Sequence, residues 1–180
     1  IINNFFVNSN EPFPTQKGPY ITNKNVLHSS KEVFDVVTSS KIREIASEFI
    51  GGKPILKTAR TYSIKKGDTR FPWHADNILP NGEYYNSMGI VCILYLVDDL
   101  KEGTFWVSNF KSWDLKKDKK IYPSKELFSL WESGKEVSKI KAKKGDLFIF
   151  NQNLYHRHIS NNFDIDALFF QIIDDSFEII

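Results

Sequence analysis

The chain has 180 residues, of which 41% are hydrophobic, and this length and composition suit one soluble globular domain with a substantial core. The formal net charge of +2 argues against nucleic acid or a membrane surface as the main partner. A single cysteine, Cys92, excludes an intramolecular disulfide and predicts a reducing compartment, which we expect to be the cytoplasm. No apolar run approaches the ~20 residues that a membrane-spanning helix requires, and the start of the chain lacks the pattern of a signal peptide.

The N-terminal third combines an irregular start with two helix signals. The first 28 residues read as extended strand and loop, interrupted by prolines. Ser29 and Glu32 match a capping box ahead of apolar residues, which predicts the start of a helix. A second stretch has apolar residues at the helical spacing i, i+3, i+4, i+7 and i+8, namely Ile42, Ile45, Ala46, Phe49 and Ile50. Glycines at 51 and 52 predict its end, so we expect a helical support over about residues 29–52.

Beyond residue 52 the chain takes on the character of short β-strands. Segments rich in β-branched and aromatic residues are separated by Gly, Asn, Asp and Pro. The predicted strands are Lys57–Ile64, Trp73–Asn77, Gly89–Val97, Thr104–Ser108, Leu147–Phe150, His156–Ser160 and Asp166–Ile173. Ile90–Leu96 is apolar almost throughout, which predicts that both of its faces are covered. Many short strands after two helices predict a β-sandwich or barrel.

An insert over about residues 109–136 interrupts the strands. Its charge run, Lys116–Lys120, is predicted to be a solvated loop. A helix that ends at Gly134 is predicted from the apolar residues Leu127, Leu130 and Trp131. Because the sequence contains neither a second core nor a linker, we predict one domain over residues 1–180, mainly β with N-terminal helices, whose β core spans about residues 57–174.

The segment Trp73–Asn77 contains the pattern His-x-Asp, formed by His74 and Asp76. On a strand, residues i and i+2 point to the same face, so this imidazole and this carboxylate can meet one metal ion. A second imidazole from another strand would complete a facial triad and leave open positions on the metal. That donor set suits non-haem Fe(II), which needs vacant positions for O2 and a cosubstrate. Alone, the pattern is weak, because a polar loop contains the same residues by coincidence.

The second imidazole has three candidates, because the chain has four histidines. His28 directly precedes the predicted helix and is expected at the surface. The turn at residues 151–154 leads into Tyr155–His158, which carries His156 and His158. These two histidines share one face of the predicted strand, so strand alternation does not choose between them.

Four blocks of the sequence, in this order and spacing, resemble the 2-oxoglutarate/Fe(II)-dependent oxygenases, especially their prolyl-4-hydroxylase-like branch. The blocks are His74–Asn77, Ile90–Leu96, Glu102–Phe105, and Lys144–Phe150 leading into Tyr155–Arg157. No block is specific singly, and the resemblance covers about two thirds of the chain. It implies a double-stranded β-helix (a jelly roll, cupin-like) with N-terminal helices packed on one sheet. It also implies that the distal iron ligand is His156, because the family places this histidine directly after the Gly-Asp strand and its turn.

The resemblance further implies where 2-oxoglutarate, as cosubstrate, would bind. Tyr62, on the strand before the His-x-Asp motif, and Tyr95, on the strand after it, stand at positions that contact 2-oxoglutarate in related enzymes. The family usually pairs the distal carboxylate with an Arg or Lys about nine or ten residues after the second histidine, but Ile165 and Asp166 stand there. A carboxylate taken out of water needs a cation or several donors, and Asp166 is expected to repel it.

This departure from the family has three alternative explanations. Arg60 shares strand parity with Tyr62 and is our first choice for a relocated cation. Arg157 adjoins the ligand histidine, but alternation points it away from the metal. The third explanation is that the protein does not use 2-oxoglutarate. Trp73 and Trp106 have two equal alternatives: they line a substrate pocket, or they pack in the core. Tyr62 and Tyr95 likewise either contact 2-oxoglutarate or are core aromatics with a bonded hydroxyl.

The resemblance as a whole implies an enzyme: an Fe(II)- and 2-oxoglutarate-dependent dioxygenase that uses O2, releases succinate and CO2, and hydroxylates a small-molecule or peptide substrate. Asp76 favours hydroxylation, since halogenases of the family have a small residue there so that chloride can bind. Two alternatives stay open: a jelly-roll dioxygenase of cupin type that does not use 2-oxoglutarate, and a catalytically silent jelly-roll binding module. The cupin alternative is disfavoured because cupins usually have more histidine ligands than this chain can supply. The silent binding module is disfavoured because the chain retains all three candidate metal ligands, which such a module would not need.

Overall fold

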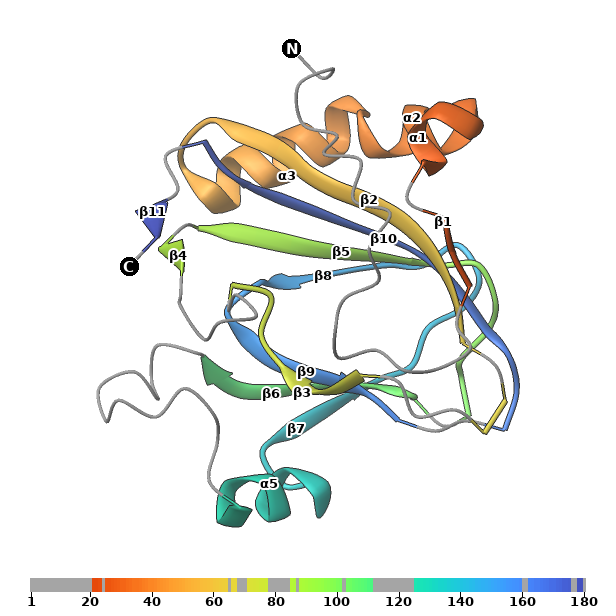
Figure 1. Cartoon of the computed structure of the whole chain (residues 1–180), viewed down its shortest axis with the longest axis vertical. Helices are drawn as coiled ribbons and strands as arrows, with labels where there is room; N and C mark the ends of the chain where they lie inside the picture. Colours follow the sequence, from red (N-terminus) through yellow and green to blue (C-terminus); the bar gives the residue numbers. More distant parts are fainter. Residues whose placement is uncertain are drawn as a thin grey trace.

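Two antiparallel β-sheets face each other in the computed structural model of the protein (Figure 1). The structure describes residues 21–23, 25–64, 66–67, 71–77, 85–86, 88–101, 103–111, 125–159, 162–175 and 178–179, with the backbone alone at 21–23, 71–72, 85–86, 110–111, 125–128 and 178–179. The five-stranded sheet has the order β1 (Ile21–Asn23), β2 (Pro54–Ile64), β10 (Ile165–Asp174), β5 (Gly89–Tyr95) and β8 (Leu147–Asn151). The four-stranded sheet has the order β3 (Phe71–His74), β9 (Leu154–His158), β6 (Phe105–Lys111) and β7 (Val137–Ile140). A short separate pair consists of β4 (Tyr85–Asn86) and β11 (Glu178–Ile179).

The chain passes back and forth between the two sheets, which is the topology of a double-stranded β-helix. Strands β2, β5, β8 and β10 belong to the five-stranded sheet, while β3, β6, β7 and β9 belong to the four-stranded one. The predicted fold class, mainly β with N-terminal helices in a jelly roll, is confirmed. The extent of the single domain, residues 1–180, stays a prediction. Among the described helices, none combines the length and the apolar character that crossing a bilayer requires.

Three helices cover the outer face of the five-stranded sheet, and one lies on the far side of the four-stranded sheet (Figure 1). The covering helices are α1 (Val26–Ser29), α2 (Lys31–Val37) and α3 (Ser40–Ile50), and the fourth is α5 (Lys125–Glu132). The apolar face predicted for α3 is largely the buried one, because Ile42, Ala46 and Ile50 are buried while Phe49 stays exposed. Gly51 ends α3 with a φ of 72°, a left-handed conformation that glycine adopts without strain.

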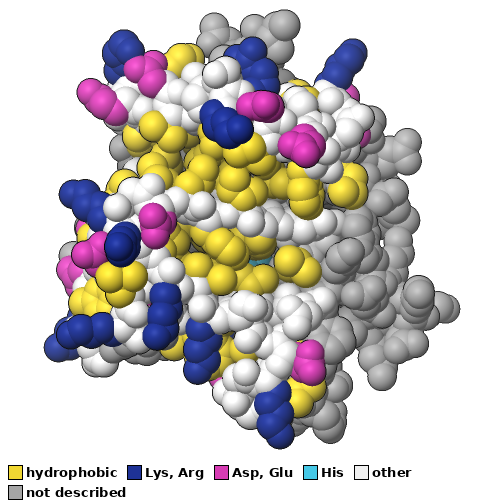
Figure 2. Space-filling model, turned by 180° about the vertical axis from the view of Figure 1, so that it is seen from behind, with side chains coloured by type: hydrophobic (Ala, Val, Ile, Leu, Met, Phe, Trp, Pro, Cys, Tyr) yellow, Lys and Arg dark blue, Asp and Glu magenta, His cyan; other side chains and the backbone are white. Residues whose placement is uncertain are grey.

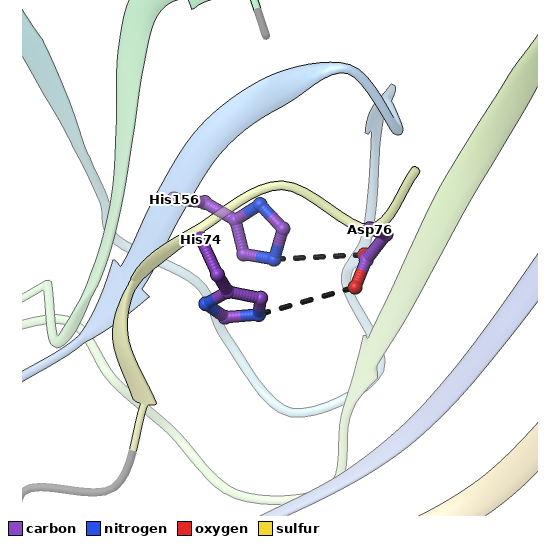
Figure 3. Close-up of side chains that lie close together, drawn as sticks. All are labelled: His74, Asp76 and His156. Carbon is purple, nitrogen blue, oxygen red and sulfur yellow. Dashed lines mark ion pairs between the residues drawn. The ribbon is translucent and has the colours of Figure 1, made fainter. Parts of the chain in front are cut away.

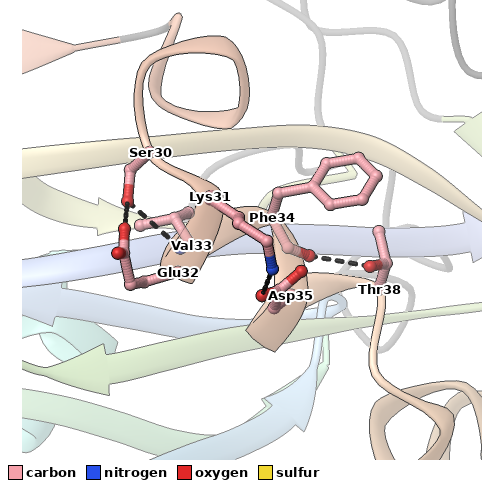
Figure 4. Close-up of polar contacts among 7 residues, drawn as sticks. All are labelled: Ser30, Lys31, Glu32, Val33, Phe34, Asp35 and Thr38. Carbon is pink, nitrogen blue, oxygen red and sulfur yellow. Dashed lines mark hydrogen bonds and ion pairs between the residues drawn. The ribbon is translucent and has the colours of Figure 1, made fainter.

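Ser30 caps helix α2, one residue later than predicted (Figure 4). The Val33 amide donates to Ser30 Oγ at 3.2 Å, and Ser30 Oγ donates to Glu32 Oε2 at 2.9 Å. Ser29 is instead the last residue of α1, a short helix that the sequence reading missed. The prediction of Ser29 was wrong because both serines precede Glu32 closely, and the end of α1 decides which of them has the extended backbone of a cap.

Strand β5 is covered on both faces, as its apolar sequence predicted. Its residues alternate between the two layers of the core. Those that pack toward the helices are Ile90, Cys92 and Leu94, and those that pack toward the four-stranded sheet are Val91, Ile93 and Tyr95. Large apolar side chains therefore pack on both faces of β5, one set against the helices and the other between the two sheets.

The predicted strands all exist, with ends displaced by a few residues, but one displacement concerns the candidate site. Strand β3 ends at His74, so Asp76 lies in the turn that follows and not on the strand. Strand β7 was missed, since four residues of alternating polarity give a weak signal. The predicted helix of the insert is α5, and Gly134 follows it with a φ of 77°. The charge run Lys116–Lys120 lies outside the described residues.

The surface in Figure 2 carries charges of both signs, interspersed with hydrophobic side chains. The most exposed large hydrophobic residues of the described part are Phe34, Val36, Phe49, Met88, Leu96 and Leu100. Mixed signs on this face agree with the low net charge of +2.

Candidate metal centre

His74, Asp76 and His156 point toward one another inside the jelly roll (Figure 3). Antiparallel pairing of β3 with β9 sets His74 directly opposite His156. One side-chain nitrogen or oxygen of each of the three residues lies within 4.8 Å of the others, and no other such group of His, Cys, Asp or Glu occurs among the described residues. Asp76 Oδ1 lies 3.9 Å from His74 Nε2, and Asp76 Oδ2 lies 3.6 Å from His156 Nε2.

The hydrogen bonds of His156 make this cluster fit a cation. Its Nδ1 lies 3.0 Å from the Leu154 carbonyl oxygen, which can only accept, so Nδ1 carries the proton. Burial, together with neighbouring His74, lowers the pKa of His156 to about 4, although Asp76 opposes the shift. The imidazole is therefore neutral near pH 7, and its Nε2 lone pair faces a carboxylate oxygen. Two acceptors facing each other at 3.6 Å are complementary to a metal ion between them.

Gln152 holds Asp76 in place although the turn that carries Asp76 is not part of a strand. The Asp76 amide donates to the Gln152 carbonyl oxygen at 3.1 Å. Gln152 is fully buried, and its side chain accepts a hydrogen bond of 2.7 Å from Gln171 Nε2 on β10. The side chain also lies so close to Gly89 that a Cβ at that position would be 2.5 Å from it. The position of Asp76, the candidate carboxylate ligand, thus depends on a residue that contacts β5 and β10 of the opposite sheet.

His158, the other candidate that strand alternation allowed, belongs to a separate polar network. Its Nε2 lies 3.3 Å from Thr104 Oγ1, which donates to Asp99 Oδ2 at 2.7 Å. Asp99 also accepts from the backbone amides of Gly103 and Thr104, at 3.1 and 2.7 Å. Since the ring is engaged there, the structure groups His156, and not His158, with His74 and Asp76.

The residues expected to bind the cosubstrate line the inner face of the five-stranded sheet. Tyr62 and Tyr95 flank Ala167 in one cross-strand row, and Arg60 is in the next row, with its guanidinium 4.5 Å from the centre of the Phe169 ring. The hydroxyl of Tyr95 is buried and has no hydrogen-bond partner within the part of the chain that the structure describes. Burial raises the pKa of both tyrosines, so both hydroxyls keep their protons and can donate.

Ile165 and Asp166 occupy the positions at which 2-oxoglutarate-dependent oxygenases usually have a cation, and their side chains point in opposite directions. Ile165 is buried among the apolar residues between the sheets. Asp166 points the other way and accepts a hydrogen bond from Ser63 on β2. The expected repulsion by Asp166 was therefore wrong, because strand alternation removes its carboxylate from the interior. Arg157 also points outward, as predicted, where it pairs with Glu132 of α5.

Trp73 and Trp106 belong to an apolar cluster on the outer face of the four-stranded sheet, so of the two alternatives for these residues the structure supports packing in the core. The buried members of this cluster are Trp73, Ala75, Trp106, Trp131 and Tyr155. Trp73 Nε1 donates to Glu132 Oε1 at 3.2 Å, and the same oxygen pairs with Arg157. Glu132 thus joins the residue before His74 to the residue after His156.

One cation near the site was missed in the sequence. Lys57 stands at a β-bulge, because Thr58 pairs with Gln171 while Leu56 pairs with Ile172. Burial lowers the pKa of Lys57 to about 8; attraction by Asp76 opposes the shift and repulsion by Arg60 adds to it. The side chain is therefore mainly charged at neutral pH and lies within electrostatic reach of the candidate ligand. Nothing in the local sequence marks this bulge.

No protein-family model matches the chain, and no curated protein sequence matches it either. Solved structures do match. HygX from Streptomyces hygroscopicus, with nickel and 2-oxoglutarate bound, has a TM-score of 0.63 at 13% identity, over 86% of this chain and 72% of HygX. EctD from S. alaskensis, with bound Fe, has a TM-score of 0.64 at 14% identity, over 86% of this chain and 56% of EctD. SnoK, a non-heme alpha ketoglutarate dependent carbocyclase from nogalamycin biosynthesis, has a TM-score of 0.65 at 14% identity, over 88% of this chain and 64% of SnoK.

This chain has the fold of these three proteins. At identities of 13–14% the similarity concerns the fold alone, and the chain spans between 56% and 72% of their lengths. The activity therefore has to be argued from the residues of the site.

Proposed function

We propose that the protein is a non-haem Fe(II)- and 2-oxoglutarate-dependent dioxygenase in which His74, Asp76 and His156 hold the iron. The observation that carries this proposal is the position of the Nε2 lone pair of neutral His156, 3.6 Å from a carboxylate oxygen of Asp76. Two imidazoles and one carboxylate on one side of a metal are the donor set of Fe(II) oxygenases. Support comes also from neighbours of the same fold, which include proteins solved with Fe or with nickel and 2-oxoglutarate.

We assign the cosubstrate to the wall formed by Tyr62, Tyr95 and Arg60. Arg60 would pair with a carboxylate of 2-oxoglutarate in place of the family's usual cation, and Tyr62 would donate a hydrogen bond. The unpartnered, buried hydroxyl of Tyr95 supports this assignment, since a buried donor without an acceptor costs about 1–3 kcal/mol and a bound carboxylate removes that cost. The apolar side chains around the wall exclude water from the site.

When bound, Fe(II), 2-oxoglutarate and O2 supply an oxidant that removes hydrogen from a substrate, with release of succinate and CO2. We infer that the outcome is hydroxylation, because Asp76 occupies the position at which halogenases have a small residue. The neighbour SnoK is a carbocyclase, so the same fold serves other outcomes. Membership of the prolyl-4-hydroxylase-like branch rests on the sequence motifs alone, and the cytoplasmic location rests on Cys92 as the sole cysteine.

We place the substrate among small molecules or peptides. A small molecule is favoured by HygX, which has also been solved with hygromycin B bound together with nickel and 2-oxoglutarate.

An anaerobic titration tests the proposal. Fe(II)-loaded protein is titrated with 2-oxoglutarate while the weak visible charge-transfer band is followed, and succinate is then measured after O2 is admitted. A band and succinate are expected, and both should vanish in the His156→Ala variant. Iron binding without a band or succinate would favour a dioxygenase that does not use 2-oxoglutarate. Loss of iron binding as well would favour a silent binding module.

The same titration tests Arg60. Arg60→Met should weaken 2-oxoglutarate binding about tenfold or more, because a charge-assisted hydrogen bond is lost. Fe(II) binding should stay unchanged. An unaltered 2-oxoglutarate affinity would remove Arg60 from the site.

A further inference from the structure

Strand β3, which carries His74, is joined to its sheet by a short and irregular set of backbone pairs. It has four residues and lies at the edge of the four-stranded sheet, where β9 is its single neighbour among the described strands. The register between the two strands shifts between Phe71 and His74. A short, irregular pairing specifies the position of a strand less strongly than a long, regular one. The position of His74 against β9 therefore depends in part on side-chain contacts.

The last turn of α5, which lies beneath the four-stranded sheet in Figure 1, supplies such contacts through Glu132. Glu132 Oε1 accepts a hydrogen bond of 3.2 Å from Trp73 Nε1 on β3, and the same oxygen forms an ion pair with Arg157 on β9. The Arg157 guanidinium also lies 5.8 Å from the centre of the Trp73 ring. One carboxylate oxygen thus joins the two strands directly beside their candidate metal ligands.

The preceding residue of α5, Trp131, packs against the same two strands. Its ring centre lies 4.8 Å from that of Trp73 on β3 and 5.4 Å from that of Tyr155 on β9. Tyr155 directly precedes His156, and both Trp131 and Tyr155 are fully buried. Because buried rings are close-packed, a displacement of one ring is passed on to its neighbours. The end of α5 therefore contacts residues adjacent to both candidate histidine ligands.

The burial of Arg157 makes its contact with Glu132 more than a surface ion pair. The Arg157 side chain is 15% exposed, and no other ion pair of Arg157 occurs among the described residues. A largely buried guanidinium that loses its anion is expected to turn toward water, since an unpaired charge away from water is costly. Arg157 follows His156 directly on β9, so this movement should displace the strand at the candidate ligand.

We propose that Glu132 is a positioning residue of the metal centre. By holding Trp73 and Arg157 together, it fixes the register of β3 against β9 and thereby the relative position of the two imidazoles. The inference rests on the metal site of the proposed function and does not involve 2-oxoglutarate. It assigns to α5 the role of setting the ligand geometry from outside the jelly roll.

Co(II) is a suitable probe, because its visible ligand-field bands change with the angles between its ligands. Glu132→Ala removes both contacts, so it should lower Co(II) affinity about tenfold and shift these bands. Glu132→Gln retains an oxygen that can accept from Trp73 and Arg157. Its bands should match those of the wild type, and its Co(II) affinity should stay within about threefold.

Lys139→Ala is the matched control. Lys139 Nζ lies 4.5 Å from the centre of the Trp106 ring, so this variant also loses a charged contact on the outer face, but between β6 and β7. It should bind Co(II) with the affinity and bands of the wild type. Urea unfolding without metal compares the stability of the variants. If Co(II) affinity falls in both variants in proportion to their loss of stability, Glu132 is merely structural and the inference is overturned.

The route of the effect is tested in a second background. Trp73→Phe and Arg157→Met together remove the two groups that Glu132 holds. Adding Glu132→Ala to this double variant should change neither Co(II) affinity nor the bands, because Glu132 has nothing left to hold. A further loss would overturn the inference, since Glu132 would then act by another route.

The same titrations separate this inference from the proposed function. Unchanged Co(II) affinity and bands in Glu132→Ala alone would overturn the inference and leave the metal site intact. Wild-type protein that binds no Co(II), or a His156→Ala variant that binds it as tightly as the wild type, would refute the metal site itself, and the inference with it.

Discussion

His74 and His156 are direct cross-strand partners on β3 and β9, with imidazole ring centroids 4.2 Å apart. Paired positions on adjacent antiparallel strands hold two side chains at a nearly constant separation, so the two imidazoles are oriented before any metal arrives. Asp76 reaches the same point from the turn after β3. The geometry of the three candidate ligands therefore depends on strand pairing for the histidines and on Gln152 for the carboxylate.

The two histidines of β9 should differ sharply in metal binding. His156→Ala should lower Co(II) affinity by about 100-fold or more, since a ligand is lost, whereas His158→Ala should lower it less than about tenfold. Anaerobic titration followed by the visible absorption of Co(II) measures both affinities. Similar losses in the two variants would contradict the assignment of His156.

Thermal and denaturant stability give a second measure of the same site. At a Co(II) concentration 100 times the dissociation constant, the metal should stabilise the wild type by about 2.7 kcal/mol, because it binds only the folded state. His158→Ala, although destabilised by the loss of its contact with Thr104, should keep most of this increment. His156→Ala should lose it. Unfolding in urea with and without Co(II) provides the comparison.

Gly89→Ala should damage the metal centre from the opposite sheet. The added Cβ would lie 2.5 Å from the side-chain amide of Gln152, so that amide, which accepts from Gln171, must shift, and we expect the shift to reach the Gln152 backbone carbonyl that holds Asp76. We expect a loss of stability of about 1–3 kcal/mol from overpacking and a loss of Co(II) affinity of about tenfold. Ala46→Val overpacks the helix layer instead and is the control. Equal Co(II) affinities in the two variants would show that Gly89 matters for packing alone.

Glu132→Gln should weaken the outer face without removing the metal. The variant loses the charge that pairs with Arg157 but can still accept from Trp73. Because the Glu132 side chain is 49% exposed, solvent screens the pair and the loss should be about 0.5–1 kcal/mol. Urea unfolding at low salt and in 1 M NaCl measures this loss of stability. In 1 M NaCl the screening length is roughly threefold shorter than at physiological ionic strength, so the difference between the variant and the wild type should shrink. Glu48→Gln on the exposed side of α3 should change little; an equal effect there would argue for a general charge effect.

Cys92 should resist thiol reagents in the folded protein. Burial raises the pKa of its thiol to about 12, and the side chain packs in the layer between β5 and the helices. An aromatic disulfide reagent at pH 8 should label it slowly in native buffer and at once in urea. Fast native labelling would contradict the buried position.

The same shift in the pKa of Cys92 predicts the sign of a pH effect on stability. Below about pH 8.5 the thiol is protonated in both the folded and the unfolded state, so it adds no pH dependence. Above that value the unfolded thiol ionises while the folded one does not, and the free energy of unfolding should fall toward pH 12. Cys92→Ala should reduce this fall, as pH-dependent urea unfolding can measure.

Features that depend on local pattern could be predicted. The spacing of Ile42, Ala46 and Ile50 indicated the buried face of α3, and the apolar run of β5 indicated a strand covered on both sides. The pattern failed where two neighbours satisfy the same rule. Ser29 and Ser30 both precede Glu32, and the structure chose Ser30 because α1 ends at Ser29.

The sequence by itself predicted a sandwich or barrel of short strands and limited the candidate ligands to a few residues, because both follow from residue types and their spacing within short segments. The order of four sequence blocks, through the family resemblance, then predicted the jelly roll. Strand alternation left His156 and His158 equivalent, and only the family resemblance favoured His156. The pairing of β9 with β3 places His156, and not His158, opposite His74. The metal itself stays a prediction for these residues. The structure also turned Asp166 outward and put a bulge into β2 at Lys57. Such orientations are set by hydrogen-bond register between strands distant in sequence, and no local pattern contains that information.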